Sequence, residues 1–195
     1  MKFKILIFFF IAINFYSNAQ FSEPYRYSII VLKTGDTLVG YGKTKNKGFK
    51  YRAHSNMKPY FIDFSEIDYL QQLYSNKNLK TFKFFQINHS IQYFKLEELL
   101  KGKYAELYGI IYNVNSSGAG GISISQTVVK YYIKKVSESK ITYFGPKLSV
   151  GFKEKIINYF ADCPELIKKI ENKDFRMRDG LEQVVEFYNK NCNPE

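Results

Sequence analysis

The spacing of apolar residues changes near Pro146, and this change constrains the fold more than any other feature of the sequence. Before Pro146, apolar and polar residues alternate, as they do in half-buried β-strands. Segment 127–136 shows the alternation most clearly. One face of this segment carries Val129, Tyr131 and Ile133, and the other carries Lys130, Tyr132 and Lys134. After Pro146, apolar residues recur at helical spacing. The sequence therefore predicts an α+β fold, with an antiparallel β domain followed by a helical segment.

The β domain is expected to contain many short strands joined by polar turns. Two extended runs flank Gly35-Asp36, a pair typical of a tight hairpin. The strands are predicted at 27–32, 37–41, 49–53, 59–64, 81–87, 90–94, 104–113, 127–136 and 141–144. A short helix at 96–100, ended by Gly102, is expected to interrupt them. This pattern favours an antiparallel sheet, a sandwich or a small barrel.

Three short amphipathic helices are predicted after Pro146. Their apolar positions are Phe152, Ile156, Ile157 and Phe160, then Leu166, Ile167 and Ile170, then Leu181, Val184, Val185 and Tyr188. Asp162 precedes Glu165 by three residues, and Asp179 precedes Glu182 by three, so acidic capping boxes are expected. Pro164 suits the first turn of the second helix, with Cys163 as an alternative cap.

The chain begins with the pattern of a secretory signal peptide. Lys2 and Lys4 precede an apolar run, and Ser17-Asn18-Ala19 resembles a cleavage site. The apolar run is shorter than the roughly 20 residues that cross a bilayer. The expected organisation is a signal peptide at 1–19, an antiparallel β domain at 20–146 and a helical segment at 147–195. We therefore expect a protein exported to the periplasm or the cell surface, with no transmembrane segment after cleavage.

The two cysteines, Cys163 and Cys192, fall at the start of the second predicted helix and the end of the third. In an antiparallel helix pair these two ends lie side by side, and an oxidising compartment favours a disulfide. A zinc site would need further ligands, but His54 and His89 show no ligand spacing to the cysteines. The sequence thus predicts a structural disulfide, no metal and no cofactor.

The positive charge raises the question of an anionic partner. The formal charge falls from +11 to +9 when Lys2 and Lys4 leave with the signal peptide, and nearly all the cations are lysines. Lysine-rich composition can reflect codon usage alone, so a solvated surface is the simpler interpretation of Lys130, Tyr132 and Lys134. A basic-aromatic face that stacks bases is the alternative, although nucleic acid is the less favoured partner. An envelope protein or an anionic glycan remains open.

Few residues point to chemistry. Gly118, Gly120 and Gly121 form a glycine-rich loop that lacks the ending of a P-loop, so a loop for partner contact is the functional expectation. The carboxylates of Asp63, Glu66 and Asp68 could serve acid-base chemistry on a glycan, although strand-end and turn roles are favoured. His54 and His89 make no triad by sequence. No catalytic residue is assigned.

Several stretches of the sequence occur together with the signal-peptide pattern: "TGDTLVGYGK", "LLKGKYAELYG", "YYIKK", "YFADCPEL" and "VVEFYNKNC". In this combination the chain resembles a group of exported proteins of Bacteroidota-type bacteria. The resemblance implies a periplasmic or surface setting and no particular activity. The first strands also resemble those of small SH3-like barrels. The sequence favours a non-enzymatic binding or interaction module of the envelope; the alternative is a hydrolase of an envelope polymer that uses Asp63, Glu66, Asp68 or a histidine.

Overall fold

The fold was analysed in a computed structural model, which describes residues 23–74, 77–87, 90–117, 123–147 and 149–192. Residues 1–19, His89 and the glycines Gly118, Gly120 and Gly121 lie outside the described residues. The strands are β1 (Arg26–Leu32), β2 (Thr37–Lys45), β3 (Gly48–Arg52), β4 (Tyr60–Asp63), β5 (Ile67–Leu73), β6 (Leu79–Gln86), β7 (Tyr93–Leu100), β8 (Ala105–Ser117), β9 (Ser123–Lys135) and β10 (Thr142–Pro146). The helices are α2 (Phe152–Tyr159), α3 (Pro164–Glu171) and α4 (Glu182–Asn191), with short 3-10 turns η2 (Phe64–Glu66) and η3 (Met177–Asp179).

The described strands form one antiparallel sheet in the order β10-β9-β8-β7-β6-β5-β1-β2-β3-β4. Strands β1 to β4 form a meander, and η2 then returns the chain so that β5 pairs with β1 on the other side. From β5 to β10 each strand pairs with its neighbour in sequence. The α+β fold is thus confirmed, but the sheet is open, and the small barrel is not.

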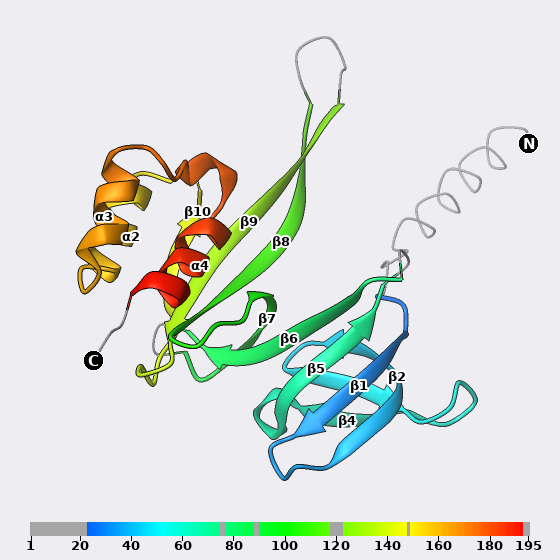
Figure 1. Ribbon diagram of the computed structural model, residues 1–195. Coiled ribbons are helices and arrows are strands. Elements are labelled where there is room, and N and C mark those ends of the chain that lie inside the picture. Colours follow the sequence, from blue (N-terminus) through cyan, green and yellow to red (C-terminus); the bar gives the residue numbers. More distant parts are fainter. Residues whose placement is uncertain (1–22, 75–76, 88–89, 118–122, 148, 193–195) are drawn as a thin grey trace, which may run out of the picture.

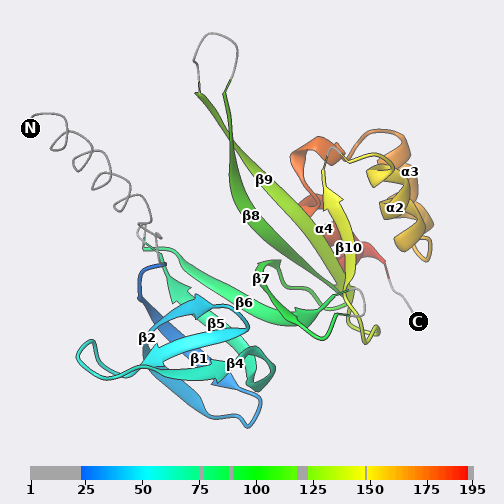
Figure 2. The same ribbon diagram turned by 180° about the vertical axis from the view of Figure 1, so that it is seen from behind.

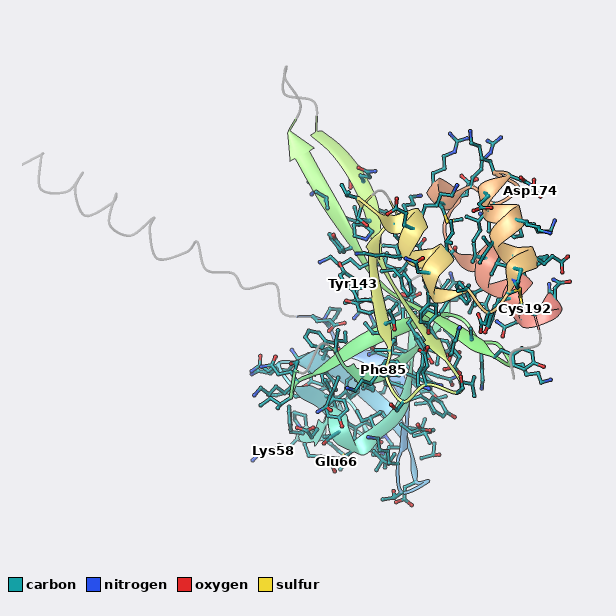
Figure 3. All side chains as sticks on the ribbon, turned by 90° about the vertical axis from the view of Figure 1, so that its left-hand side faces the viewer. Lys58, Glu66, Phe85, Tyr143, Asp174 and Cys192 are labelled. Carbon is teal, nitrogen blue, oxygen red and sulfur yellow. A yellow bond between two sulfur atoms is a disulfide. The ribbon has the colours of Figure 1, made fainter. Side chains whose placement is uncertain are left out.

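The sheet bends into two lobes that meet at β6 (Figure 1). The amino-terminal lobe (23–86) surrounds a buried cluster that includes Ile30, Phe49, Leu70 and Phe82. The carboxy-terminal lobe (93–192) has the three helices on one face of β8 to β10, as the reverse view also shows (Figure 2). Figure 3 shows Glu66 and Cys192 well apart, one in each lobe.

The carboxy-terminal core joins the helices to the sheet. Its buried cluster includes Leu107 and Ile133 from the strands, and Ile156, Leu166 and Val184 from the three helices. A smaller cluster, on the other face of β7 to β10, contains Ile87, Leu96, Tyr108, Tyr132 and Ile141. Where β8 and β9 pair with β7 and β10, a buried cluster therefore covers each of their faces. This explains why three successive residues, Tyr131, Tyr132 and Ile133, are all buried.

The structure differs from the predicted elements in three places. Segment 96–100 belongs to strand β7, where it pairs with β6 and β8, so strand pairing outweighs the helical preference of its leucines and glutamates. Strand β5 was not foreseen. Neither acidic capping box forms. The alternative cap predicted for the second helix, Cys163, is the N-cap of α3, and Leu181 is the N-cap of α4; neither makes a side-chain cap bond.

Candidate binding surface

The β2–β3 hairpin carries the densest run of positive charge in the amino-terminal lobe. Between positions 43 and 52 the chain has five cations and no carboxylate: Lys43, Lys45, Lys47, Lys50 and Arg52. The turn between the strands contains Asn46, whose φ of 50° lies in the left-handed region that asparagine tolerates. The tight turn keeps both strands in register, so the cations are held on a regular surface.

Strand pairing places most of these cations on one face. Lys43 lies directly opposite Lys50, and Tyr41 lies opposite Arg52. Side chains two residues apart share a face, so Lys45 joins Lys43 on the same side. The opposite side carries Phe49 and Tyr51, which are buried in the core. We call the outer side, defined by Lys43, Lys45, Lys50 and Arg52, the basic face.

The basic face is hollowed beside the amino-terminal strand. A cavity of about 380 Å³ is lined by Glu23, Tyr25, Lys43, Thr44, Lys45, Asn46 and Lys50. The ring of Tyr25 lies 4.2 Å from the Arg52 guanidinium carbon and 5.0 Å from Lys43 Nζ. A tyrosine ring attracts cations over its face. Tyr25 therefore holds two of the cations beside the cavity.

Aromatic rings continue the basic face on both sides. Tyr27 and Tyr41 are exposed and meet edge to face, with 6.1 Å between ring centroids. Phe61 is exposed and lies opposite Lys50 on β4. Its ring passes 2.2 Å from the place where a Cβ at Gly48 would sit, so only glycine leaves room for it there. The basic face thus combines lysines with exposed aromatic rings.

The acidic groups near this face are few and already engaged. Glu23 forms an ion pair with Arg26. Asp63 accepts hydrogen bonds from the backbone N–H and hydroxyl of Ser65, and these bonds lower the pKa of the Asp63 carboxyl. Among the described residues, no ion pair involves Lys45, Lys50 or Arg52. The face therefore presents net positive charge to solvent.

A buried polar network lies on the inner side of the same strands. Lys95 Nζ donates to Gln72 Oε1 at 2.6 Å and to Thr44 Oγ1 at 3.2 Å, and it lies 4.0 Å from the centroid of Phe82. Gln72 Nε2 donates in turn to Ser28 Oγ. Gln72 and Ser28 are fully buried. Burial lowers the pKa of Lys95 to about 8, so this lysine titrates closer to neutral pH than an exposed one.

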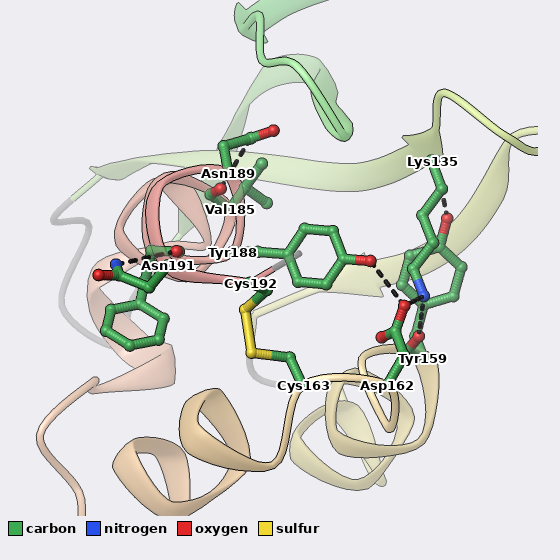
Figure 4. Close-up of a disulfide and its surroundings, with 10 residues drawn as sticks. Lys135, Tyr159, Asp162, Cys163, Val185, Tyr188, Asn189, Asn191 and Cys192 are labelled. Atoms are coloured by element: carbon green, nitrogen blue, oxygen red, sulfur yellow. Dashed lines mark hydrogen bonds and ion pairs between the residues drawn. A yellow bond between two sulfur atoms is a disulfide. The ribbon is translucent and has the colours of Figure 1, made fainter. Parts of the chain in front are cut away.

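The predicted disulfide is confirmed. Cys163 at the start of α3 is bonded to Cys192 at the end of α4, with a Cα–Cα distance of 5.7 Å (Figure 4). Next to it, Asp162 accepts hydrogen bonds from Lys135 Nζ at 2.8 Å and Tyr188 OH at 2.6 Å. Burial of Asp162 opposes ionisation, but these hydrogen bonds outweigh it and lower the pKa of the carboxyl. Together these contacts fasten the helices to β9.

The other predicted site residues do not come together in one place. Tyr132 is only 6% exposed and packs on Tyr143 with 4.9 Å between ring centroids. Its ring is therefore not available for stacking between Lys130 and Lys134, because the smaller cluster of the carboxy-terminal lobe covers it. Lys130 lies instead 5.2 Å from the ring centroid of Tyr112. The basic-aromatic face is on β2 and β3, not on β9.

The carboxylates proposed for acid-base chemistry mainly serve a turn. Asp63 caps η2, and Glu66 Oε1 accepts a hydrogen bond from the Asp63 backbone N–H, which completes a capping box. Asp68 is exposed on β5, and His54 is exposed in the segment between β3 and β4. No group of three or more potential metal ligands occurs among the described residues.

The sequence does contain a signal for the basic face. Lysines at alternate positions 43 and 45, followed after a turn by Lys50 and Arg52, place cations on one side of a hairpin. The register that brings Lys43 opposite Lys50 depends on the turn at Asn46. Lys95 and Gln72 gave no such signal, because their contact joins strands far apart in the chain.

Comparison with known proteins found no matching family model, no similar curated protein and no similar solved structure. In the part of the chain that the structure describes, no helix is long and apolar enough to cross a membrane.

Proposed function

We propose that this protein is exported and acts as a non-enzymatic binding protein, with an acidic glycan held on the basic face. The observation that carries the proposal is the direct pairing of Lys43 with Lys50 beside a cavity. Like charges opposite each other on neighbouring strands destabilise a sheet. An anionic ligand in the cavity would offset this repulsion. The pairing of two lysines therefore suits the binding of an anion, although it destabilises the ligand-free sheet.

The residue types favour an acidic sugar over a nucleic acid. Lysine acts as a compact point charge, whereas arginine provides the planar fork that suits phosphates. The basic face has three lysines and one arginine, and the Arg52 guanidinium is stacked on Tyr25. Tyrosine rings present an apolar body and a polar tip, which suits a ligand that is both apolar and hydroxylated. A glycan that carries one carboxylate on each successive sugar ring therefore fits the lysines and tyrosines of the basic face.

Export and the envelope setting belong to the same proposal. The leader-like sequence at 1–19 and the resemblance to exported proteins of Bacteroidota-type bacteria support them. The disulfide between Cys163 and Cys192 is consistent with an oxidising compartment. The strand order β5-β1-β2-β3-β4, with η2 between β4 and β5, also supports a likeness of this lobe to SH3-like barrels.

The test is calorimetric titration of the exported chain with a hexamer of galacturonic acid. We expect binding that weakens with added salt, and no binding of a neutral glucose hexamer. In the double variant Lys43→Gln/Lys50→Gln, the affinity should fall by about a hundredfold or more, since two lost charge-assisted hydrogen bonds at about 1.5 to 3 kcal/mol each remove at least about 3 kcal/mol.

The matched control is Lys140→Gln/Lys190→Gln, which removes the same charge from exposed positions elsewhere. The control should bind the acidic hexamer within about twofold of the unmodified chain, since distant surface charges are screened by salt. An equal loss in both variants would show that net charge alone attracts the ligand. Tighter binding of a single-stranded hexanucleotide than of the acidic hexamer would contradict the glycan proposal and identify nucleic acid as the ligand.

A further inference from the structure

Strands β8 and β9 extend beyond the rest of the sheet as a two-stranded projection (Figures 1 and 2). Pairing between β7 and β8 ends at Gly109, and pairing between β10 and β9 ends at Lys130. Beyond these residues β8 and β9 pair with each other, and no other described strand pairs with them. We call the paired residues 111–115 and 125–129 the arm. Each strand of the arm thus has one edge with no neighbour among the described strands.

The two faces of the arm differ in polarity. Tyr112, Val114 and Val128 share one face with Gln126, and Tyr112 and Val114 are 37% and 42% exposed. The other face has Asn113, Asn115, Ser125 and Thr127 toward the tip, with a hydrogen bond from Thr127 Oγ1 to Asn113 Oδ1, and Ile111 and Val129 at its base. Both faces of the arm are therefore uncharged, and apolar side chains on it are open to solvent.

The arm lacks the charges that normally protect an exposed strand edge. No Asp, Glu, Lys or Arg occurs from Leu107 to Val129, although 24% of the chain is charged. Soluble proteins commonly place lysine, proline or inward-pointing charges on open edges, because an unprotected edge pairs with other strands. An edge without such residues in a highly charged protein points to pairing with another strand.

We propose that the arm binds the arm of a second copy of this chain, and that the protein is a dimer through this contact. The net charge, +11 for the full chain and +9 without residues 1–19, makes two copies repel each other, and the arm is where they can meet without bringing like charges together. A partner of opposite charge would be selected by charged residues, which the arm does not have. An uncharged strand is also complementary to itself in an antiparallel pair, because asparagine, serine and threonine both donate and accept hydrogen bonds.

The position of the arm supports a dimer that leaves the basic face free. The arm leaves the carboxy-terminal lobe on the side away from the amino-terminal lobe, which bears the basic face (Figures 1 and 2). The dimer does not depend on the proposed glycan, and it would place two basic faces at opposite ends of one assembly. Two linked sites raise the apparent affinity for a polymer that reaches both.

Sedimentation velocity of the exported chain over a range of micromolar concentrations tests the proposal. We expect a dimer whose fraction increases with concentration. Val114→Lys places a like charge from each copy in the contact and should raise the dimer dissociation constant at least tenfold. Val136→Lys is the matched control, since Val136 is 55% exposed outside the arm, and its dissociation constant should stay within about twofold of the unmodified chain.

Three outcomes would overturn the proposal. The first is an unmodified chain that remains monomeric at every concentration. The second is an equal effect of Val114→Lys and Val136→Lys on the dimer. The third is a monomer that sediments with vesicles of anionic lipid and loses this binding in Val114→Lys, which would identify a membrane as the occupant of the arm. Circular dichroism of each variant establishes that the sheet is intact.

Discussion

At the scale of single residues, Lys95 shows how the molecule tolerates a cation inside a bent sheet. The ammonium group has two side-chain acceptors, from β5 and β2, and rests on an aromatic ring. These contacts offset part of the cost of burying a charge. They do not offset all of it, because burial still lowers the pKa of Lys95 to about 8.

This lowered pKa predicts a rise of stability with pH. Between about pH 8 and the ordinary lysine pKa near 10.5, the unfolded chain binds a proton that the folded chain has released. The free energy of unfolding should therefore increase over this interval, by up to about 3 kcal/mol. Urea unfolding at several pH values measures the rise, and the rise should be absent in Lys95→Met.

Comparison of variants separates Lys95 from the buried tyrosines. Burial raises the pKa of Tyr131 to about 12, so its ionisation in the unfolded chain lowers stability above pH 10. This effect is common to the unmodified chain, to Lys95→Met and to a control, Lys140→Met, at an exposed position. If the free energy of unfolding of Lys95→Met varies with pH in parallel with that of Lys140→Met, the rise in stability does not come from Lys95.

At the scale of elements, the turn η2 decides the path of the sheet. It carries the chain from β4 back to β5, which then pairs with β1 and not with β4. Asp63 and Glu66 hold the turn through reciprocal hydrogen bonds, and Phe64 anchors it with its ring stacked 4.5 Å from that of Phe84. Asp63 and Glu66 thus have the turn role that the sequence favoured over acid-base chemistry.

The substitution Asp63→Ala should destabilise the fold by about 1 kcal/mol, as loss of a capping side chain commonly does. Because hydrogen bonds from Ser65 lower the pKa of the Asp63 carboxyl, its stabilisation is present at neutral pH and is lost as pH falls below the ordinary pKa near 4. Chemical denaturation at pH 7 and at pH 2 measures both effects. The control is Asp68→Ala, at an exposed position on β5. An equal loss in the two variants would contradict the capping role.

The sequence predicted element type well where one physical signal dominated. Helical spacing after Pro146 predicted α2, α3 and α4, because each buries a single apolar stripe against the sheet. The sequence failed to predict the 96–100 segment of β7. Its leucines and glutamates prefer helices, but in the structure this segment pairs with two neighbouring strands, β6 and β8. The alternation in β9 predicted a basic-aromatic face there, but Tyr132 is buried by packing against residues distant in the sequence, which periodicity does not encode.

At the scale of the whole molecule, two large cores have no buried residue in common. One belongs to the amino-terminal lobe and the other joins the helices to β8, β9 and β10. The disulfide lies within the second core and closes a loop with a sequence separation of 29. Loop closure of this length contributes about 3 to 4 kcal/mol by restricting the unfolded chain.

The double variant Cys163→Ser/Cys192→Ser should therefore loosen one lobe before the other. Hydrogen exchange should show faster exchange of amides in α3 and α4, by up to several hundredfold, since local opening of the helices becomes less costly. Amides of β1 and β5 serve as the internal reference and should keep their protection. Faster exchange by the same factor in both lobes would indicate a single cooperative unit.

Strand β6 has a further consequence for how this chain can be divided. Phe82 and Phe84 of β6 belong to the amino-terminal core, while Phe85 packs with Tyr108 of the carboxy-terminal lobe at 4.8 Å between ring centroids. A gene truncated on either side of β6 would therefore leave one lobe with an exposed apolar edge. The two lobes are therefore not separable modules, and we expect that they must be expressed and engineered as one unit.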